Sequence, residues 1–176
     1  MVMARVRRGG NTTRLKGYRD RRQAGVIVAL LAICLIWVGL LIGVSFLATP
    51  VKFMAPSLSL LTGLDVGRHT FMVFNQIEVA LAVVILTLAT ARWELLTGIT
   101  AFWVSVIVFV QSTAVLPALG ARTEALIRGE FLEPSSLHTA YIALDIVKLL
   151  VLGGLVAISF HHLLCGKSAG QRLRKG

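Results

Sequence analysis

The sequence predicts an all-α integral membrane protein, a four-helix bundle with both termini in the cytoplasm. Of its 176 residues, 56% are hydrophobic, more than is typical of a soluble domain. The apolar residues gather in four segments of about 20 residues or more, each long enough to cross a bilayer. The formal charge of +10 is concentrated at the two ends of the chain, which is typical of cytoplasmic tails.

The elements follow in order along the chain. Residues 1–22 are expected to form a basic cytoplasmic tail and not a cleaved signal, because the apolar segment after them is a full span. Spans are expected at about 23–48, 69–91, 95–116 and 137–164, within a membrane domain of residues 23–164, and residues 165–176 form a second basic tail. Thr49-Pro50 and Pro117 are expected to end the first and third spans.

The remaining segments connect these spans. Arg92-Trp93-Glu94 is expected to turn at the membrane interface, with Trp93 as an anchor. The outer loops, 49–68 and 117–136, are partly apolar, so either could form a short helix on the outer membrane face. Each loop begins at a proline and ends in a His-Thr pair, at His69 and at His138. This correspondence indicates either two parallel helix-hairpin repeats or a chance match.

Lysines and arginines predict the orientation. With both termini inside, the cytoplasmic side holds 13 of them and the outer loops hold four. This asymmetry predicts a multi-pass protein of a bacterial-type inner membrane. The basic residues of the first tail are expected to bind anionic lipids or an acidic partner; they are Arg5, Arg7, Arg8, Arg14, Lys16, Arg19, Arg21 and Arg22. No nucleic-acid partner is expected, because the tail has one aromatic residue, Tyr18, and no recognisable binding module.

Polar side chains within the predicted spans are the main candidates for a functional site, because lipid offers them no partners. At about 1.5 Å per residue, all are expected in one layer in the outer half of the bundle. They are Asn75, Gln76 and Glu78 in the second span, Gln111 in the third, and Asp145 and Lys148 in the fourth.

Charge counting gives two interpretations of this layer. Asp145 and Lys148 stand at i, i+3 and could be a self-neutralising pair that helps packing. Lys148 could instead reach Glu78 on a neighbouring helix. Two acids then share one base, and the second carboxylate must take a proton or hold a cation.

Histidines provide a second candidate site. His69 and His138 begin two helices at the same boundary and could together ligate haem, copper or zinc. Alternatively, each is simply solvated at its helix start, and no cofactor is then required. His161, His162 and Cys165 form H-H-x-x-C, which we interpret as an interfacial helix end rather than a metal site.

Glycines predict close helix packing. Gly39 and Gly43 are four residues apart in the first span, and Gly153 and Gly154 are adjacent in the fourth. Such small-residue faces allow a helix to approach a neighbour, either within the bundle or in another subunit.

Two segments carry a family resemblance. They are FLATPVKFMAPSLSLLTGLDVGRHTF, residues 46–71, and VLPALGARTEALIRGEFLEPSSLHTAYIALDIVKLL, residues 115–150. They resemble the four-helix membrane family of unknown function typified by transmembrane protein 205, and the layout is similar to bacterial copper-resistance protein D. The resemblance implies the four-helix fold. It also implies that Asp145 and Lys148 are particular to this chain, because family members often carry Asn and Gln there.

These observations favour a non-enzymatic accessory subunit of a larger membrane complex of respiratory or photosynthetic type. The small size, the glycine faces and the basic tail fit this role, and no nucleophile motif, phosphate loop or dinucleotide fingerprint is present. One alternative is a small transporter or tolerance factor for protons, cations or metals that uses the polar layer. Another is a metal- or haem-binding protein that uses His69 and His138.

Overall fold

The computed structural model describes the backbone of residues 3–92 and 94–172, and the side chains of residues 17–19, 21–92 and 94–164. The described chain consists of helices joined by turns and two loops. In order these are α1 (Met3–Leu41), the π-helical η1 (Ile42–Ala48), α2 (Thr49–Lys52), α3 (Leu60–Arg92), α4 (Leu95–Val110), the π-helical η2 (Gln111–Val115), α5 (Leu116–Ile127) and α6 (Leu137–Arg172).

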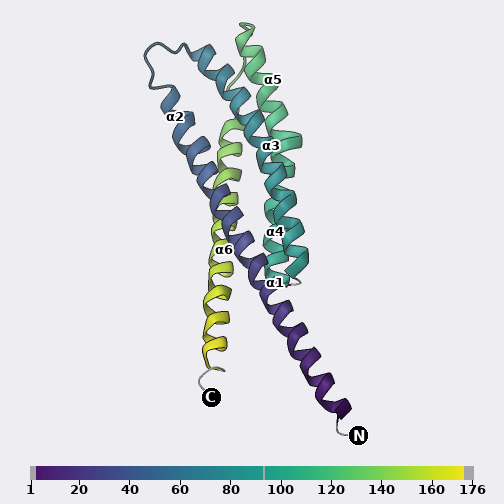
Figure 1. The fold of residues 1–176 in the computed structure, drawn as a ribbon. Helices are drawn as coiled ribbons and strands as arrows, with labels where there is room; N and C mark the ends of the chain where they lie inside the picture. The colour runs from purple at the N-terminus through teal and green to yellow at the C-terminus, as the bar shows by residue number, and fades with distance from the viewer. Residues whose placement is uncertain (1–2, 93, 173–176) are drawn as a thin grey trace.

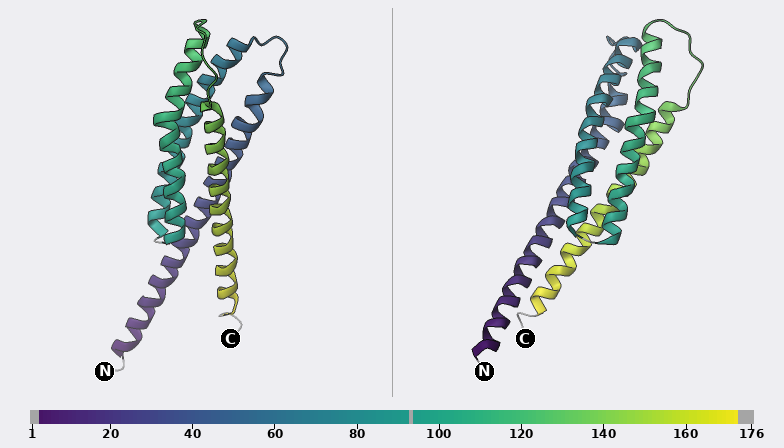
Figure 2. Two further views of the ribbon diagram at one scale, coloured as in Figure 1. Left: turned by 180° about the vertical axis from the view of Figure 1, so that it is seen from behind. Right: turned by 90° about the vertical axis from the view of Figure 1, so that its right-hand side faces the viewer.

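The long helices form an elongated bundle (Figure 1). Helix α1 packs against α6 and α3, and α4 packs against α3 and α6. The start of α1 and the end of α6 lie at one end of the bundle, which we call the termini end, and there both helices extend beyond the α3–α4 turn (Figure 2). The α2–α3 and α5–α6 connections lie at the opposite end, which we call the loop end.

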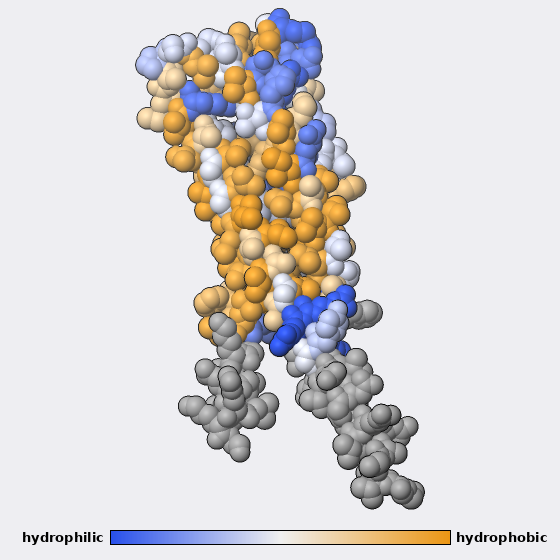
Figure 3. Space-filling view, viewed as in Figure 1, coloured by the Kyte–Doolittle hydropathy of each residue, from blue (hydrophilic) through white to orange (hydrophobic). Residues whose placement is uncertain are grey.

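Four helical stretches are long and apolar enough to cross a membrane: Gly17–Lys52, Leu60–Arg92, Leu95–Ile127 and Leu137–Leu164. On the face shown in Figure 3, a broad hydrophobic band covers the middle of the molecule, and hydrophilic residues lie above and below it. Large apolar side chains such as Phe109 and Leu150 are about 70% exposed on this band. Such a surface is typical of a membrane protein, because monomeric soluble proteins rarely expose extensive apolar patches.

A narrow apolar core holds the helices together. On α1 the buried residues recur every three or four positions, at Leu30, Cys34, Trp37 and Leu41, and all four are fully buried. This spacing places them on one face of the helix. They belong to one cluster with buried apolar residues of α3, α4 and α6, and the helices are therefore fixed relative to one another from the termini end to the middle of the bundle.

The prolines do not end the spans, contrary to the prediction from the sequence. Helix continues through Pro50 to Lys52 and through Pro117 to Ile127. Proline lacks an N–H and clashes with the carbonyl four residues earlier in a regular helix. Here a π-helical segment precedes each proline, and each proline falls in the first turn of the next α-helix, where its N–H is not needed. The backbone N–H and the Oγ1 hydroxyl of Thr49 both donate to the carbonyl of Val44, five residues back.

The predicted outer loops are correspondingly shorter. Helix α3 begins at Leu60 and not near His69; the Ser59 hydroxyl accepts from the N–H of Thr62 at 3.1 Å and caps its first turn. Helix α5 continues α4 towards the loop end instead of forming a separate helix on the membrane face. It ends at Ile127, and Gly129, whose positive φ of 82° suits the turn that closes the helix, follows the capping residue Arg128.

Candidate functional site

Five fully buried side chains meet near the middle of the bundle, one or more from each of the four spanning helices. We call them the core polar cluster: Trp37 of α1, Glu78 of α3, Gln111 of η2, and Asp145 and Lys148 of α6. Each is at most 1% exposed. Four helices therefore converge on a group of charges that is buried inside the bundle.

Lys148 lies at the centre of the core polar cluster. Its Nζ is 2.5 Å from Oε1 of Glu78 and 3.1 Å from Oδ1 of Asp145, and it donates to Oε1 of Gln111 at 2.7 Å. An ammonium group has three donors, so all three are engaged. The sequence left open whether Lys148 contacts Asp145 or Glu78, and in the structure it contacts both.

The two carboxylates are each bonded on one oxygen only. Oε1 of Glu78 also accepts from the indole Nε1 of Trp37 at 3.0 Å, and Oδ1 of Asp145 accepts from Nε2 of Gln111 at 2.9 Å. The second oxygens, Oε2 of Glu78 and Oδ2 of Asp145, are buried and have no hydrogen-bond partner among the described residues. Each carboxylate therefore retains one free acceptor position.

The core polar cluster carries one excess negative charge if every group is ionised. Glu78 and Asp145 contribute two negative charges and Lys148 one positive charge. Of the described residues, no other charged side chain forms an ion pair with any member of the cluster. Burial of an uncompensated charge is costly, so a proton or a cation is needed to balance this group.

A small cavity of about 60 Å³ extends from Asp145 towards the loop end. Besides Asp145, its walls include Ser45, Thr49, His138 and Tyr141. The Oγ of Ser45 and the hydroxyl of Tyr141 are buried and make no hydrogen bond with the described residues. We call this space the Asp145 chamber; it exceeds the volume that one water molecule needs and offers it several polar partners.

The layer next to the cluster on the termini side is apolar by contrast. Leu30 and Cys34 of α1, Ile85 of α3, and Leu152 and Leu155 of α6 are buried there, three to ten residues beyond the polar members on their own helices. Buried Thr97 and Ser159 lie beyond this apolar layer towards the termini end. The buried polar side chains that adjoin the cluster therefore lie between Asp145 and the loop end.

The other two predicted polar residues of α3 have separate environments. Asn75 is buried one turn from Glu78 and accepts from the Ser112 hydroxyl at 2.9 Å, while its Nδ2 has no partner in the described chain. Gln76 is exposed on the outside of the bundle and does not join the core polar cluster. The reason is helical rotation, since one residue turns the side chain by about 100° away from the buried face.

The two histidines predicted as possible metal ligands, His69 and His138, have surroundings that differ from each other. His69 is 61% exposed, with Nδ1 3.0 Å from the carbonyl oxygen of Asp65 and 3.4 Å from Oδ1 of Asp65. His138 is also exposed and borders the Asp145 chamber. Within the described residues, no three His, Cys, Asp or Glu side chains are grouped as metal ligands.

A second polar group, at the termini end, was not predicted as a contact site. Glu94 pairs with Arg92 at 2.6 Å and with Nε2 of His162 at 2.5 Å, and it accepts from the Thr97 hydroxyl at 2.7 Å. It therefore ties the α3–α4 turn to α6. His161 packs its ring edge-on against that of His162, with centroids 6.0 Å apart, and the side chain of Cys165 lies outside the described residues.

The glycines predicted to pack helices face open space. A Cβ added at Gly39, Gly43, Gly153 or Gly154 would meet nothing within 4 Å, so none of them makes a close contact within the bundle. The close approach occurs instead at Gly63 and Gly67 of α3, which the sequence did not distinguish. There the side chains of Phe53 and Lys52 lie against the glycine backbone.

The basic tail is only partly described. Helix α1 begins at Met3, so the predicted tail and the first span form one helix. Arg19, Arg21 and Arg22 are exposed. The side chains of Arg5, Arg7, Arg8, Arg14 and Lys16 lie outside the described residues.

No protein-family profile, curated protein or solved structure matches the chain. The resemblance to the family typified by transmembrane protein 205 therefore stays a prediction from the sequence.

Proposed function

We propose that the protein is a proton-linked membrane protein that takes up one proton at the core polar cluster from the loop end. The observation that carries this proposal is the arrangement of two fully buried carboxylates around one ammonium, with a free oxygen left on each carboxylate. Ionisable residues within membrane spans are costly and usually mark pathways of ions or protons. The proposed role is transport or proton relay, without an enzymatic reaction.

A proton balances this group better than a metal cation. The ammonium of Lys148 already lies within 3.1 Å of both carboxylates, so a divalent ion bound by them would lie close to a like charge. A proton needs only one free carboxylate oxygen. We assign its entry to Oδ2 of Asp145, because Asp145 borders the chamber and Glu78 does not.

The direction of access follows from the predicted orientation. The Lys/Arg distribution favours a bacterial-type inner membrane with both tails in the cytoplasm. The loop end then faces outwards, and the Asp145 chamber opens towards the outer side. A proton taken up there would be separated from the cytoplasm by the apolar residues on the termini side.

Infrared spectroscopy tests the proton directly. A protonated carboxylic acid has a carbonyl stretch that an ionised one lacks, so the purified protein should show this band and lose it as the pH rises. Either Asp145→Asn or Glu78→Gln should remove the band, because each leaves one acid and one base. Gln76→Leu is the matched control at the same depth, and it should keep the band. Absence of the band in the unmodified protein, or its persistence in both single variants, would refute proton binding.

Proteoliposomes test the transport role separately. We expect an outward proton gradient to dissipate faster with the unmodified protein than with Asp145→Asn, as reported by a pH-sensitive dye trapped inside. Equal rates for the unmodified protein, Asp145→Asn and empty liposomes would refute transport while leaving proton binding intact.

A second role, as an accessory subunit of a larger membrane complex, is favoured by the outward glycines. Gly39 and Gly43 on α1 and Gly153 and Gly154 on α6 leave room for another helix, which small-residue faces commonly receive. Purification in mild detergent tests this role. Recovery of a larger complex that dissociates on Gly39→Leu would support it, whereas a monomer unaffected by the substitution would count against it.

A further inference from the structure

A second and larger cavity, of about 330 Å³, lies at the loop end between α2, α3, α5 and the start of α6. We call it the loop-end cavity. Three cationic side chains from three helices line it: Lys52 of α2, Arg68 of α3 and Arg122 of α5. Much of the remaining lining is apolar, including Leu64, Phe71, Met72, Leu116, Leu119 and Leu126. No acidic residue is among those that line it in the described part of the chain.

The fit of α2 onto α3 places Lys52 in this cavity. Gly63 and Gly67 are buried on α3, and a Cβ at Gly63 would come 2.6 Å from the Phe53 ring. A Cβ at Gly67 would collide with Nζ of Lys52. The ammonium lies 4.9 Å from the centre of the Phe53 ring and forms no ion pair within the described chain. Lys52 is therefore held against α3 with its charge unneutralised.

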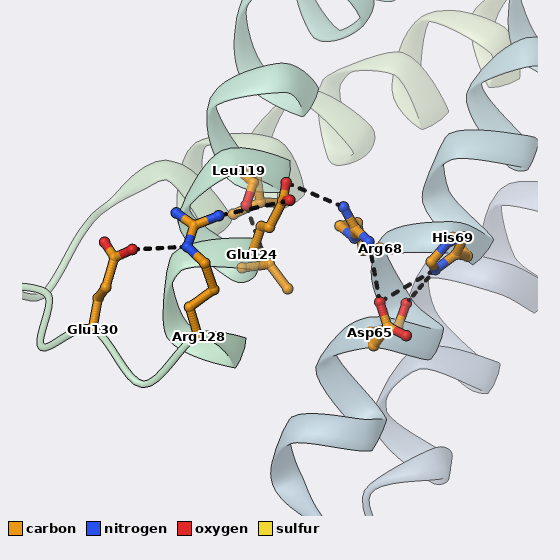
Figure 4. A network of polar contacts seen from close by, with 8 residues as sticks. Asp65, Arg68, His69, Leu119, Glu124, Arg128 and Glu130 are labelled. Atoms are coloured by element: carbon orange, nitrogen blue, oxygen red, sulfur yellow. Dashed lines mark hydrogen bonds and ion pairs between the residues drawn. The ribbon is translucent and has the colours of Figure 1, made fainter.

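The arginines have partners outside the cavity. Figure 4 shows Arg68 between Asp65 of α3 and Glu124 of α5, at 3.3 and 3.5 Å. Its Nε is buried and has no hydrogen-bond partner in the described residues. Arg122 donates to the backbone carbonyl of Glu133, which carries no net charge. Asp65 and Glu124 thus offset the charge of Arg68, whereas Lys52 and Arg122 have no carboxylate partner among the described residues and leave the cavity wall positive.

We propose that the loop-end cavity binds an anionic amphiphile, a phosphate or carboxylate headgroup carried on an alkyl chain. Lysine and arginine side chains bind such headgroups, and the apolar wall offers a surface to the chain. The volume is near the lower limit of about 300–1,000 Å³ for ligand pockets, so it suits a headgroup and part of one chain. This inference concerns a different cavity from the core polar cluster and does not depend on proton binding.

The depth of the cavity suits such a ligand. Arg68 precedes Glu78 by ten residues on α3, a rise of about 15 Å, and half the hydrocarbon thickness of a bilayer is also about 15 Å. With the core polar cluster near the membrane centre, the cations lie where phosphate headgroups meet the acyl chains. The ligand can come from an anionic lipid of the bilayer or from a free alkyl phosphate or fatty acid.

Native mass spectrometry of the full chain in a neutral detergent tests the proposal. Phosphatidylglycerol and phosphatidylcholine are offered at equal concentrations, and dodecyl phosphate, dodecyltrimethylammonium and inorganic phosphate are titrated separately. We expect phosphatidylglycerol or dodecyl phosphate to bind at least tenfold more tightly than phosphatidylcholine or dodecyltrimethylammonium. Retention of phosphatidylglycerol identifies a lipid of the bilayer as the source, and binding of dodecyl phosphate without it identifies a free amphiphile.

Variants locate the site. Lys52→Gln and Arg122→Gln should each weaken binding of the preferred anion about tenfold. Arg128→Gln is the matched control, because Arg128 is 56% exposed, pairs with Glu124 and Glu130, and lies outside the cavity lining (Figure 4). Equal loss in the control would show general surface attraction and overturn the proposal. Equal binding of the cationic amphiphile, or equally tight binding of inorganic phosphate alone, would also overturn it, and both comparisons use the unmodified protein.

Discussion

Replacement of Lys148 by methionine is the most informative perturbation of the core polar cluster. The substitution keeps the length of the side chain and removes the ammonium that contacts Glu78, Gln111 and Asp145 at 2.5, 2.7 and 3.1 Å. Two fully buried carboxylates then face each other without a cation. Removal of one partner from a buried ion pair costs about 3–5 kcal/mol, and we expect the free energy of unfolding to fall by this amount.

The charge count predicts an asymmetry between the members. Asp145→Asn leaves the Glu78–Lys148 contact, one acid with one base, and should change the stability by less than about 1 kcal/mol. The triple variant Glu78→Gln, Asp145→Asn, Lys148→Met has no buried charge and should regain most of the loss, because uncharged replacements of a buried ionic group are often neutral.

Unfolding in mixed detergent micelles, followed by circular dichroism, measures these differences. A loss of about 3–5 kcal/mol corresponds to a roughly hundred- to several-thousand-fold change in the unfolding equilibrium, since each 1.4 kcal/mol is tenfold. A cost below about 1 kcal/mol for Lys148→Met would refute the reasoning, as would an equal cost for Lys148→Met and Asp145→Asn. Either result would mean that the second carboxylate needs no compensation.

Three further predictions concern other contacts. Gly63→Ala should destabilise the protein by about 1–3 kcal/mol, because the added methyl group clashes with Phe53. Gly39→Ala, in open space, should be neutral or slightly stabilising in the purified monomer. Thermal unfolding of the two variants measures this difference, and equal stabilities would contradict the prediction. Glu94→Gln should lower the free energy of unfolding by about 1–2 kcal/mol, because it weakens the contacts with Arg92 and His162. Chemical unfolding measures this free energy, and an unchanged value would show that these contacts are dispensable. Ser45→Leu should fill part of the Asp145 chamber and slow proton uptake in stopped-flow pH jumps, and an unchanged rate would exclude this route.

The number and order of the spanning helices could be predicted from the sequence because long apolar segments are a strong signal. Their ends could not. Proline was expected to stop the helices at Pro50 and Pro117, and a π-helical segment at each place allows the helix to continue. A π-helical segment forms where backbone carbonyls accept from N–H groups five residues later, and no residue type predicts where this occurs.

The sequence predicted most residues of the core polar cluster but not the contacts between them. Glu78, Gln111, Asp145 and Lys148 meet as the depth estimate indicated, since rise per residue is fixed by helix geometry. Trp37 was missed, because an indole among leucines is indistinguishable from a packing residue until its Nε1 is seen to donate to Glu78. Gln76 and the four predicted glycines face outwards, and rotation about the helix axis depends on neighbours that a single sequence does not specify.

The Asp145 chamber and the loop-end cavity share three wall residues, Thr49, Phe71 and His138. If both proposals hold, the two occupants are coupled by heterotropic linkage. An anion on the common wall favours the protonated form of Asp145, and by reciprocity the protonated form binds the anion more tightly by the same factor. A proton and an anion would then enter from the same side as a nearly neutral pair, which lowers the electrostatic cost of placing either one in the membrane.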